Sequence, residues 1–496
     1  MLFNSFAFVY AFLPLTLAGW FLLGRGRSTA PALGLLVLAS LVYYGWEHPW
    51  HLPVLLASCL GNYYAALSLA ALAGQGRAPA AGRLAGLAVA ANLALLAYFK
   101  YTSFLLGNIN LLLGWHLAGP ALAWPLGISF FTFQQIAYLV DVRRGQEPET
   151  RLLNYLLFVT FFPKVLAGPI VRAQDLLPQL RLPGLAKISH QDLALGLALF
   201  VVGLFKKEML AEELVPLVQA AFGPAAKGAV PEFYSAWLGV LAYTLQIYFD
   251  FSGYSDMALG LARMLGLKLP YNFASPYQSV SIADLWRRWH ITLSSFLRDY
   301  LYIPLGGNRR GQARRYLNLV LTMLLGGLWH GAGWTFVIWG GLHGLYLALH
   351  QAWLRLLARR WPGRPRGTWL GAWAGRLLTF FAVSMAWVFF RASDLPAALA
   401  VFKGMLGLGG RALSPAVLAG LLVLGWRLAV VWFLPNSQQY VLGAASPSSP
   451  QAEPAAGAPW WRWRPSPAHL ALTLLLGFLA LGKMVVAVKQ FLYYQF

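Results

Sequence analysis

Long apolar runs recur along almost the entire chain and place the strongest limit on its fold. Clear examples are Phe6–Leu23, Ala30–Trp46 and Leu84–Leu106. A helix needs roughly 20 apolar residues to cross a hydrocarbon core of about 30 Å. Of the 496 residues, 59% are hydrophobic and only 11% are charged, whereas soluble domains carry about 25% charged residues. The sequence therefore excludes a soluble domain and predicts an all-α, polytopic membrane protein.

The apolar segments predict about 11 to 13 transmembrane or re-entrant helices. The fourth to sixth segments, and the pair around residue 330, are open to interpretation as full spans, half-spans or re-entrant helices. No internal repeat of fixed period is visible, which argues against a secondary transporter. The predicted segments are 5–24, 30–46, 51–72, 84–106, 121–140, 152–171, 192–210, 233–264, 316–329, 333–354, 369–391, 413–434 and 467–488.

The basic residues mostly occupy short loops between these spans. Lys and Arg number 38 against 16 Asp and Glu, which gives a formal net charge of +22. The positive-inside rule then places the N-terminus outside and the arginine-bearing loops in the cytoplasm. The excess charge is thus a topology signal, and nucleic acid is not predicted as a partner. The arginines that set this pattern are Arg25, Arg27, Arg77, Arg83, Arg143 and Arg144.

The single cysteine and the N-terminal residues argue against disulfides, a thiolate metal site and a signal peptide. Cys59 is the single cysteine and lies inside an apolar span, so the sequence offers no disulfide framework and no thiolate metal cluster. No metal site is predicted. The N-terminus lacks a cationic region before its first apolar run, so we interpret that run as a retained helix rather than a signal peptide.

Three stretches interrupt the apolar pattern. Residues 172–191 are polar and contain two prolines. Residues 355–368 are rich in arginine, which is typical of a cytoplasmic loop on anionic membrane lipids. The stretch 443–467 is rich in Ala, Pro, Ser and Gly and cannot bury enough apolar surface to order itself. It contains the cluster 460–464 of tryptophans and arginines, which indicates an interfacial aromatic belt.

A histidine lies on a predicted amphipathic helix over 278–305. Apolar residues recur there at three- and four-residue spacing, while charged residues occupy the other side. Ser281 and Asp284 predict a capping box at its start. His290 is either an anchor at the polar boundary or a substrate contact. Arg287 and Arg288 are either headgroup anchors or, if they face a cytoplasmic vestibule, groups that attract the phosphates of a nucleotide-bearing donor.

A second histidine lies in the segment 326–334, where glycines interrupt an apolar run. Each glycine costs about 1 kcal/mol in a helix relative to alanine, so the pattern predicts a helix break or close backbone contact. Broken helix at membrane depth is tolerated only where it is buried in protein or lines a watery cavity. His330 at this break is therefore a functional-site candidate, with a packed structural histidine as the alternative. His343 is interpreted as structural, and Gly340, Gly341 and Gly344 as marks of close helix packing.

Two carboxylates, Asp250 and Asp256, lie in an aromatic span. Ionised groups at that depth are expensive, so each is expected to pair or to face water. A proton relay, a pair with Arg or Lys, and a partner that orients a catalytic histidine all stay open. The sequence has no HExxH, Walker A, GxGxxG or GxSxG motif, so a metalloprotease, an ATPase and a serine hydrolase find no support.

Three segments carry a resemblance to a known family. They are Tyr248–Ala258 (YFDFSGYSDMA), Trp286–Asn308 (WRRWHITLSSFLRDYLYIPLGGN) and Gly326–Gly344 (GGLWHGAGWTFVIWGGLHG). Together they resemble the membrane-bound O-acyltransferase family and, more narrowly, its bacterial alginate O-acetyltransferase branch. Segments 125–131 and 161–170 agree with it, and the resemblance extends to about residue 395.

The resemblance implies a helical fold around a central tunnel, in three parts. These are N-terminal transmembrane helices in 1–120, a catalytic core in 121–395 that includes the amphipathic or re-entrant helix 278–305, and C-terminal helices in 396–496 with the Pro/Ala-rich loop 443–467. His330 matches the family's catalytic residue, and His290 is the second motif histidine. The remaining residues expected at the site, for lining it, orienting groups or binding the donor, are Trp329, Asp256, Arg287, Arg288 and Trp286.

The resemblance also implies an activity and its setting. We expect an O-acetyltransferase of the bacterial inner membrane that uses cytoplasmic acetyl-CoA as donor and holds no tightly bound cofactor. Its acceptor would be an exported polysaccharide, alginate or a related exopolysaccharide, with an SGNH-type partner in the periplasm or on the membrane. The alternatives are D-alanyl transfer, acetylation of peptidoglycan or cellulose, a proton-coupled transporter of a polysaccharide intermediate, and a scaffold for a secretion complex.

Overall fold

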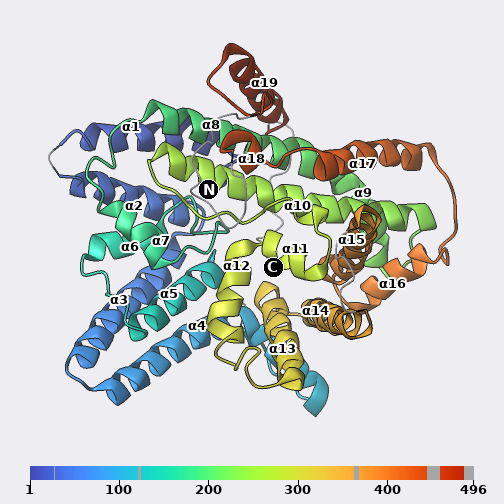
Figure 1. Cartoon of the computed structure of the whole chain (residues 1–496), viewed down its shortest axis with the longest axis horizontal. Coiled ribbons are helices and arrows are strands. Elements are labelled where there is room, and N and C mark those ends of the chain that lie inside the picture. Colours follow the sequence, from blue (N-terminus) through green and yellow to red (C-terminus); the bar gives the residue numbers. More distant parts are fainter. Residues whose placement is uncertain (27, 121–123, 362–367, 444–458, 485–496) are drawn as a thin grey trace. The chain divides into compact units, whose positions relative to one another are not determined.

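A computed structural model describes residues 1–26, 28–120, 124–361, 368–443 and 459–484. The chain divides into two compact units. Unit 1 comprises Met1–Val202 and Tyr254–Pro270, and unit 2 comprises Gly203–Gly253 and Tyr271–Phe496. Across the described ranges, helices are the only regular secondary structure (Figure 1). The predicted all-α class is thereby confirmed.

Unit 1 holds most of the N-terminal helices and the end of one long helix from later in the chain. Helices α3 and α4 pack against each other, and α5 packs on both (Figure 1). Helices α8 and α10 each extend from one unit into the other. The elements are η1 (Ala7–Phe12), α1 (Leu13–Leu23), α2 (Ala30–Gly45), η2 (Pro49–His51), α3 (Leu52–Gly74), α4 (Ala78–Leu113), α5 (Ile128–Arg143), α6 (Leu152–Thr160), α7 (Ala173–Leu180), α8 (His190–Phe205) and the end of α10 (Phe233–Met264).

Unit 2 holds the start of α10 and all the elements after residue 270. Its helices α13 and α14 form an antiparallel hairpin, on which α15 packs. The other elements are η3 (Lys206–Ala211), η4 (Glu212–Leu214), α9 (Val215–Ala225), η5 (Pro276–Gln278), α11 (Ile282–Arg288), α12 (Ile291–Leu297), η6 (Arg298–Tyr302), α13 (Gln312–His330), α14 (Trp334–Arg360), α15 (Trp369–Arg391), α16 (Leu395–Met405), α17 (Pro415–Phe433), α18 (Ser437–Val441) and α19 (Pro467–Met484).

Within the described residues, five helical segments are long and apolar enough to cross a membrane. Three further apolar helices are shorter, at Ala7–Leu23, Ala30–Gly45 and Leu395–Met405. All of these helices except Leu395–Met405 coincide with predicted spans. The total of about 11 to 13 crossings or partial crossings stays a prediction. Arg27, most of the loop 443–467, Arg364 and Arg366 lie outside the described residues. The five long segments are Pro49–Gly74, Ala78–Leu113, Trp369–Arg391, Pro415–Phe433 and Pro467–Met484.

The predicted segment 152–171 enters and leaves unit 1 on the same side. Its helix α6 ends at Thr160, and its 9 residues reach only about 14 Å at 1.5 Å per residue. Arg181 after the segment pairs with Glu149 before it at 2.7 Å. The hydrogen bond raises the pKa of the Arg181 guanidinium above its usual value. Of the alternatives left open by the sequence, these contacts favour a re-entrant segment.

Loops predicted to be cytoplasmic gather at this same end of unit 1. Gly24 packs so closely on Ala186 that a Cβ there would collide with the Ala186 side chain. A Cβ on Gly82 would lie 3.7 Å from the Arg143 guanidinium. The loops that follow α1, α3 and α5 therefore share one end of the unit, as the positive-inside rule predicts.

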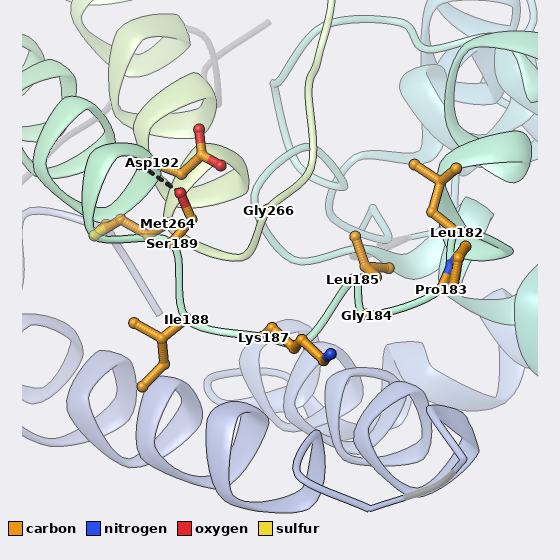
Figure 2. A pocket seen from close by; sticks show the side chains of 10 residues that line it. All are labelled: Leu182, Pro183, Gly184, Leu185, Lys187, Ile188, Ser189, Asp192, Met264 and Gly266. Carbon is orange, nitrogen blue, oxygen red and sulfur yellow. Dashed lines mark hydrogen bonds between the residues drawn. The ribbon is translucent and has the colours of Figure 1, made fainter.

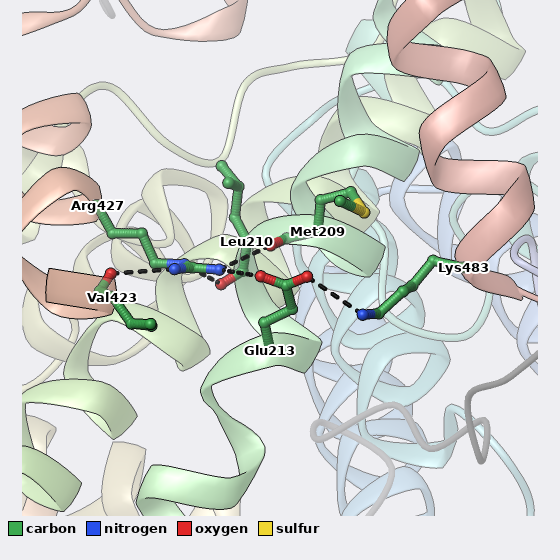
Figure 3. Close-up of polar contacts among 6 residues, drawn as sticks. All are labelled: Met209, Leu210, Glu213, Val423, Arg427 and Lys483. Atoms are coloured by element: carbon green, nitrogen blue, oxygen red, sulfur yellow. Dashed lines mark hydrogen bonds and ion pairs between the residues drawn. The ribbon is translucent and has the colours of Figure 1, made fainter. Parts of the chain in front are cut away.

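A buried arginine of α17 in unit 2 bonds to η3, the π-helix that directly follows α8. The π-helix η3 leaves the carbonyls of Met209 and Leu210 available, and Arg427 donates to them at 2.9 and 3.1 Å (Figure 3). Arg427 also pairs with Glu213 at 2.7 Å, and Lys483 of α19 approaches the same carboxylate at 3.2 Å. No sequence motif predicted this cluster, although a single arginine within an apolar run indicates a buried charge that needs partners.

Replacing Arg427 by leucine is expected to destabilise the protein by about 3 kcal/mol, because it leaves the carbonyls of Met209 and Leu210 without a donor and removes a cation from the partly exposed Glu213. Lys483→Met is the matched control. It removes a cation from the same carboxylate, but Lys483 is 42% exposed, so its loss should cost under about 1 kcal/mol. The thermal unfolding midpoints of both variants in detergent measure this. Equal unfolding midpoints for the Arg427→Leu and Lys483→Met variants would show that Arg427 does not stabilise the fold as expected.

Candidate active site

The predicted helix over 278–305 is broken in the structure at one of the candidate histidines. Ser281 caps α11 by accepting from the Asp284 amide at 3.2 Å, as predicted, while the Asp284 carboxylate accepts from Val280 rather than from Ser281. The helix then ends at Arg288, and His290 adopts a left-handed conformation with φ 42° and ψ 56°. The prediction of one continuous helix is therefore wrong.

Asn272 explains the break. Its carbonyl accepts from the Ile291 amide at 3.0 Å, and its side-chain oxygen accepts from the Thr292 hydroxyl at 2.6 Å. Through these bonds Asn272, which lies outside the helix, accepts from the first residues of α12, whose backbone N–H groups have no partner within the helix. A capping side chain usually fills this role. Left-handed backbone is uncommon outside glycine and is retained only where surrounding contacts impose it. Asn272 is fully buried, and no sequence motif predicted its role.

His330 is the last residue of α13, immediately before the glycine break. Gly331 and Gly333 both have extended backbone, and α14 begins at Trp334. A Cβ on Gly331 would collide with the Phe336 ring, so this glycine permits the ring to pack there. The predicted helix break is confirmed, with His330 directly at its edge.

A glycine seam holds α13 against α14 below the break. A Cβ on Gly327 would collide with the carbonyl of Phe336, and one on Gly340 would collide with the carbonyl of Met323. A Cβ on Gly344 would lie 2.8 Å from the Val320 Cα. The prediction that glycines 340 and 344 mark close helix packing is confirmed, and the seam fixes where His330 projects.

Aromatic rings enclose both motif histidines. His330 is 5% exposed, and its ring centroid lies 4.9 Å from Trp329, 5.1 Å from Trp339 and 5.3 Å from Phe390. His290 is fully buried and lies 6.2 Å from the same Trp329 ring. The structure thus brings His290, Trp329 and His330 together in unit 2, as the sequence predicted.

His343 and Trp286 extend this aromatic cluster through their contacts with Trp339. His343 is 1% exposed and lies 4.7 Å from the Trp339 ring and 5.2 Å from Trp286. Trp286 comes from α11, and the two other rings come from α14. Trp286 therefore lies near the candidate site, and His343, interpreted as structural from sequence, lies in the same cluster.

The two candidate arginines differ in their contacts. The Arg288 guanidinium pairs with Asp284 at 3.0 Å and donates to the Ala274 carbonyl at 3.4 Å, so part of its role is to hold α11. Arg287 is exposed. Donor binding by either arginine stays a prediction.

The two carboxylates of α10 fall in different units. Asp250 lies in unit 2 and pairs with Lys207 at 2.5 Å, and Lys207 also pairs with Glu212 at 2.7 Å. The pairing alternative is confirmed for Asp250. Asp256 is fully buried in unit 1, and its place at the site stays a prediction. Within the described ranges, no group of three or more His, Cys, Asp or Glu side chains is arranged to hold a metal ion.

A pocket of about 290 Å³ opens in unit 1, between the loop before α8 and the end of α10. Its lining includes Lys187 and Ser189 of the loop before α8, together with Met264 at the end of α10 and Gly266 just after it (Figure 2). Ser189 accepts from the Asp192 amide at 3.2 Å, which caps α8. None of the predicted site residues lines this pocket.

Comparison with known proteins decides the family. Residues 149–390 match the membrane-bound O-acyltransferase family, MBOAT. A peptidoglycan O-acetyltransferase of Helicobacter pylori is 43% identical over 438 residues, covering 83% of this chain and 80% of that protein. This chain belongs to the MBOAT family. The protein named "Probable alginate O-acetylase AlgI" from Pseudomonas putida is 39% identical over 513 residues, covering 100% of both chains.

A more distant relative is similar over a shorter part of the chain. A teichoic acid D-alanyltransferase of Streptococcus thermophilus is 30% identical over 239 residues, covering 46% of this chain and 57% of that protein. The MBOAT assignment and the O-acetyltransferase relatives make this chain an acyltransferase. Both motif histidines of the present structure lie inside the matched range 149–390.

Gly331→Ala is expected to lower acyltransferase activity at least about tenfold, because a Cβ there displaces the Phe336 ring and well-packed interiors transmit such strain. Phe336 packs on Phe390, which contacts His330. Gly333→Ala is the matched control, since its Cβ would lie 3.6 Å from Phe336 in ordinary contact. Ester formation per amount of inserted protein measures both, and a Gly331→Ala enzyme as active as the control would contradict the argument.

Proposed function

We propose that this protein is an acetyl-CoA-dependent O-acetyltransferase that moves acetyl groups across the bacterial inner membrane for O-acetylation of an exported polysaccharide. The observation that carries the proposal is the position of His330, buried at a glycine break and joined to His290 through the Trp329 ring. A titratable group enclosed by apolar rings at such a break is a functional-site candidate. The alginate and peptidoglycan O-acetylating relatives supply the substrate class.

In the proposed mechanism, His330 acts as general base. It takes the proton of an acceptor hydroxyl while the hydroxyl oxygen attacks the thioester carbonyl carbon. The new C–O bond forms, the C–S bond breaks, and the departing thiolate takes up the proton that His330 holds, which leaves an acetyl ester and free CoA thiol. A thioester is already activated, so positioning and one general base, worth about 10²–10⁴ in rate, account for the chemistry.

The membrane location fits a donor and an acceptor on opposite sides. Acetyl-CoA is cytoplasmic, and an exported polysaccharide is modified beyond the inner membrane. Arg287 is exposed on α11 near the site, so we assign it the donor's phosphates, with Arg288 beside it. We assign Trp329, whose ring contacts both histidines, the role of orienting them, and Asp256 stays assigned to lining or orienting the site.

The acceptor side requires further proteins and lipids. We propose that acetyl groups pass to alginate or a related exopolysaccharide, directly or through an SGNH-type partner in the periplasm. The basic loops at one end of unit 1 are assigned to the cytoplasmic surface and its anionic lipids. No tightly bound cofactor is needed by this mechanism.

Peptidoglycan is the second candidate acceptor, because a peptidoglycan O-acetyltransferase shares 43% identity over 83% of this chain. D-alanyl transfer has weaker support, since that relative covers only 46% of the chain. Mass spectrometry of base-labile acetyl groups on purified exopolysaccharide and peptidoglycan distinguishes the two main acceptors. We expect deletion of the gene to remove acetyl from the exopolysaccharide and leave the peptidoglycan unchanged.

His330→Ala is expected to reduce acetyl-ester formation by about 10²–10⁴-fold, because it removes the general base. His116→Ala is the control, since His116 is exposed and lies in a loop. Acetyl-CoA turnover by purified protein in detergent measures both, after the amount of inserted protein is matched. Near-normal turnover by His330→Ala would remove this histidine from the mechanism, and absence of turnover in the unmodified protein would favour the transporter.

His290→Ala tests the second histidine separately, through donor binding and turnover. A contact with the acyl donor predicts weaker binding of acetyl-CoA, whereas a role in the transition state predicts a lower kcat with unchanged KM. His290→Asn is the matched variant, because asparagine tolerates the left-handed backbone of this position. If both variants bind and turn over acetyl-CoA like the unmodified protein, the role of His290 is structural.

A further inference from the structure

Four buried polar atoms beside His330 have no hydrogen-bond partner in the part of the chain that the structure describes. They are both ring nitrogens of His343 and the indole nitrogens of Trp286 and Trp339. His343 and Trp339 are each 1% exposed. A buried polar atom left without a partner costs about 1–3 kcal/mol, and native proteins pair most of them. These four atoms lie in one cluster of rings, where one bound polar group could satisfy them together.

The three rings form one cluster that adjoins the catalytic candidate. Trp339 and His343 are four residues apart on α14, so they project from the same helix face, with ring centroids 4.7 Å apart. Trp286 lies 5.2 Å from His343 and 5.9 Å from Trp339. The Trp339 ring also contacts the His330 ring at 5.1 Å. The unsatisfied atoms thus belong to three rings in mutual contact, and one of these rings, Trp339, also contacts the proposed base.

A neighbouring tryptophan shows that the fold can satisfy an indole here. Trp387 stacks on Trp339 at 5.6 Å, and its Nε1 donates to the Tyr277 hydroxyl at 3.2 Å. That hydroxyl in turn donates to the Thr244 carbonyl at 2.6 Å. The same aromatic cluster therefore pairs the Trp387 indole with a protein acceptor, whereas the described residues offer none to the indoles of Trp286 and Trp339. This difference favours a ligand over loose packing as the explanation for Trp286 and Trp339.

The chemistry of the unsatisfied atoms selects the ligand group. Two indole N–H groups are fixed donors without charge, and a neutral imidazole adds one donor and one acceptor. Such a set suits a single oxygen that gains negative charge during reaction. Dry, preorganised donors of this kind stabilise an oxyanion strongly, because the enclosure excludes water. A phosphate or carboxylate would instead be expected to meet arginine or lysine.

We propose that Trp286, Trp339 and His343 form the subsite that binds the carbonyl oxygen of the acyl thioester and holds it as an oxyanion. This inference rests on the proposed function and assigns three residues to its donor. As the acceptor oxygen bonds to the carbonyl carbon and His330 takes its proton, the C=O electron pair moves to the oxygen that the N–H groups hold. The carbonyl re-forms as the C–S bond breaks, and the thiolate leaves with the proton from His330.

Binding of two acetyl-CoA analogues tests the subsite without turnover. One is the ketone in which a methylene replaces the thioester sulfur, and the other is S-ethyl-CoA, which lacks the carbonyl. The unmodified protein should bind the ketone more tightly. Trp339→Phe and Trp286→Phe keep an aromatic ring but remove the N–H, and each should reduce this preference by about three- to tenfold, the worth of one hydrogen bond. Trp387→Phe is the matched control and should keep the preference.

Turnover of acetyl-CoA supplies the second measurement. Trp339→Phe and His343→Phe should lower kcat by about 10²-fold with little change in KM, the effect of losing one oxyanion donor, while Trp387→Phe stays near the unmodified rate. Equal analogue preference and kcat in all variants would overturn the subsite while leaving the proposed function intact. Failure of the unmodified protein to bind either analogue or turn over acetyl-CoA would instead overturn the proposed function.

Discussion

The rest of the site depends on the close approach of α13 and α14. Three glycines let the two helices approach closely, because a Cβ at Gly327, Gly340 or Gly344 would collide with backbone atoms of the facing helix. The extended residues at Gly331 and Gly333 then end one helix and begin the next within a few residues. His330 projects from the end of α13 because of this hairpin, and Trp339 follows on the facing helix. Any change to the seam changes the position of the proposed base.

A second constraint is the enclosure of polar chemistry by aromatic rings. Trp329 touches both motif histidines, and Trp339 touches both His330 and His343. In a dry environment a hydrogen bond or charge counts for more than in water. The same environment penalises any polar atom without a partner. The unpaired N–H groups of the cluster therefore destabilise the empty protein, and a ligand oxygen that accepts from them would bind strongly. Donor recognition and catalysis thus arise from the same residues in this account.

Local features were predictable from the sequence, whereas contacts between distant residues were not. The glycine break at His330, the cap at Ser281 and a cation for Asp250 follow from rules that act within a few residues or from the cost of burying a charge. The break at His290 was not predicted, because Asn272 imposes it from outside the amphipathic pattern. The single arginine in the apolar run of α17 indicates a buried charge, but the sequence does not show that Arg427 bonds to carbonyls of η3 and to Glu213, because tertiary structure sets these partners.

The proposed function requires that acetyl pass through this protein from one face of a membrane to the other. The most direct test reconstitutes the purified protein in sealed vesicles, with a hydroxyl acceptor inside and labelled acetyl-CoA outside. The account predicts labelled acetyl ester inside the vesicles, in amounts that depend on His330 and on protein oriented with its basic loops outward. Ester formation only when donor and acceptor share one compartment would contradict it.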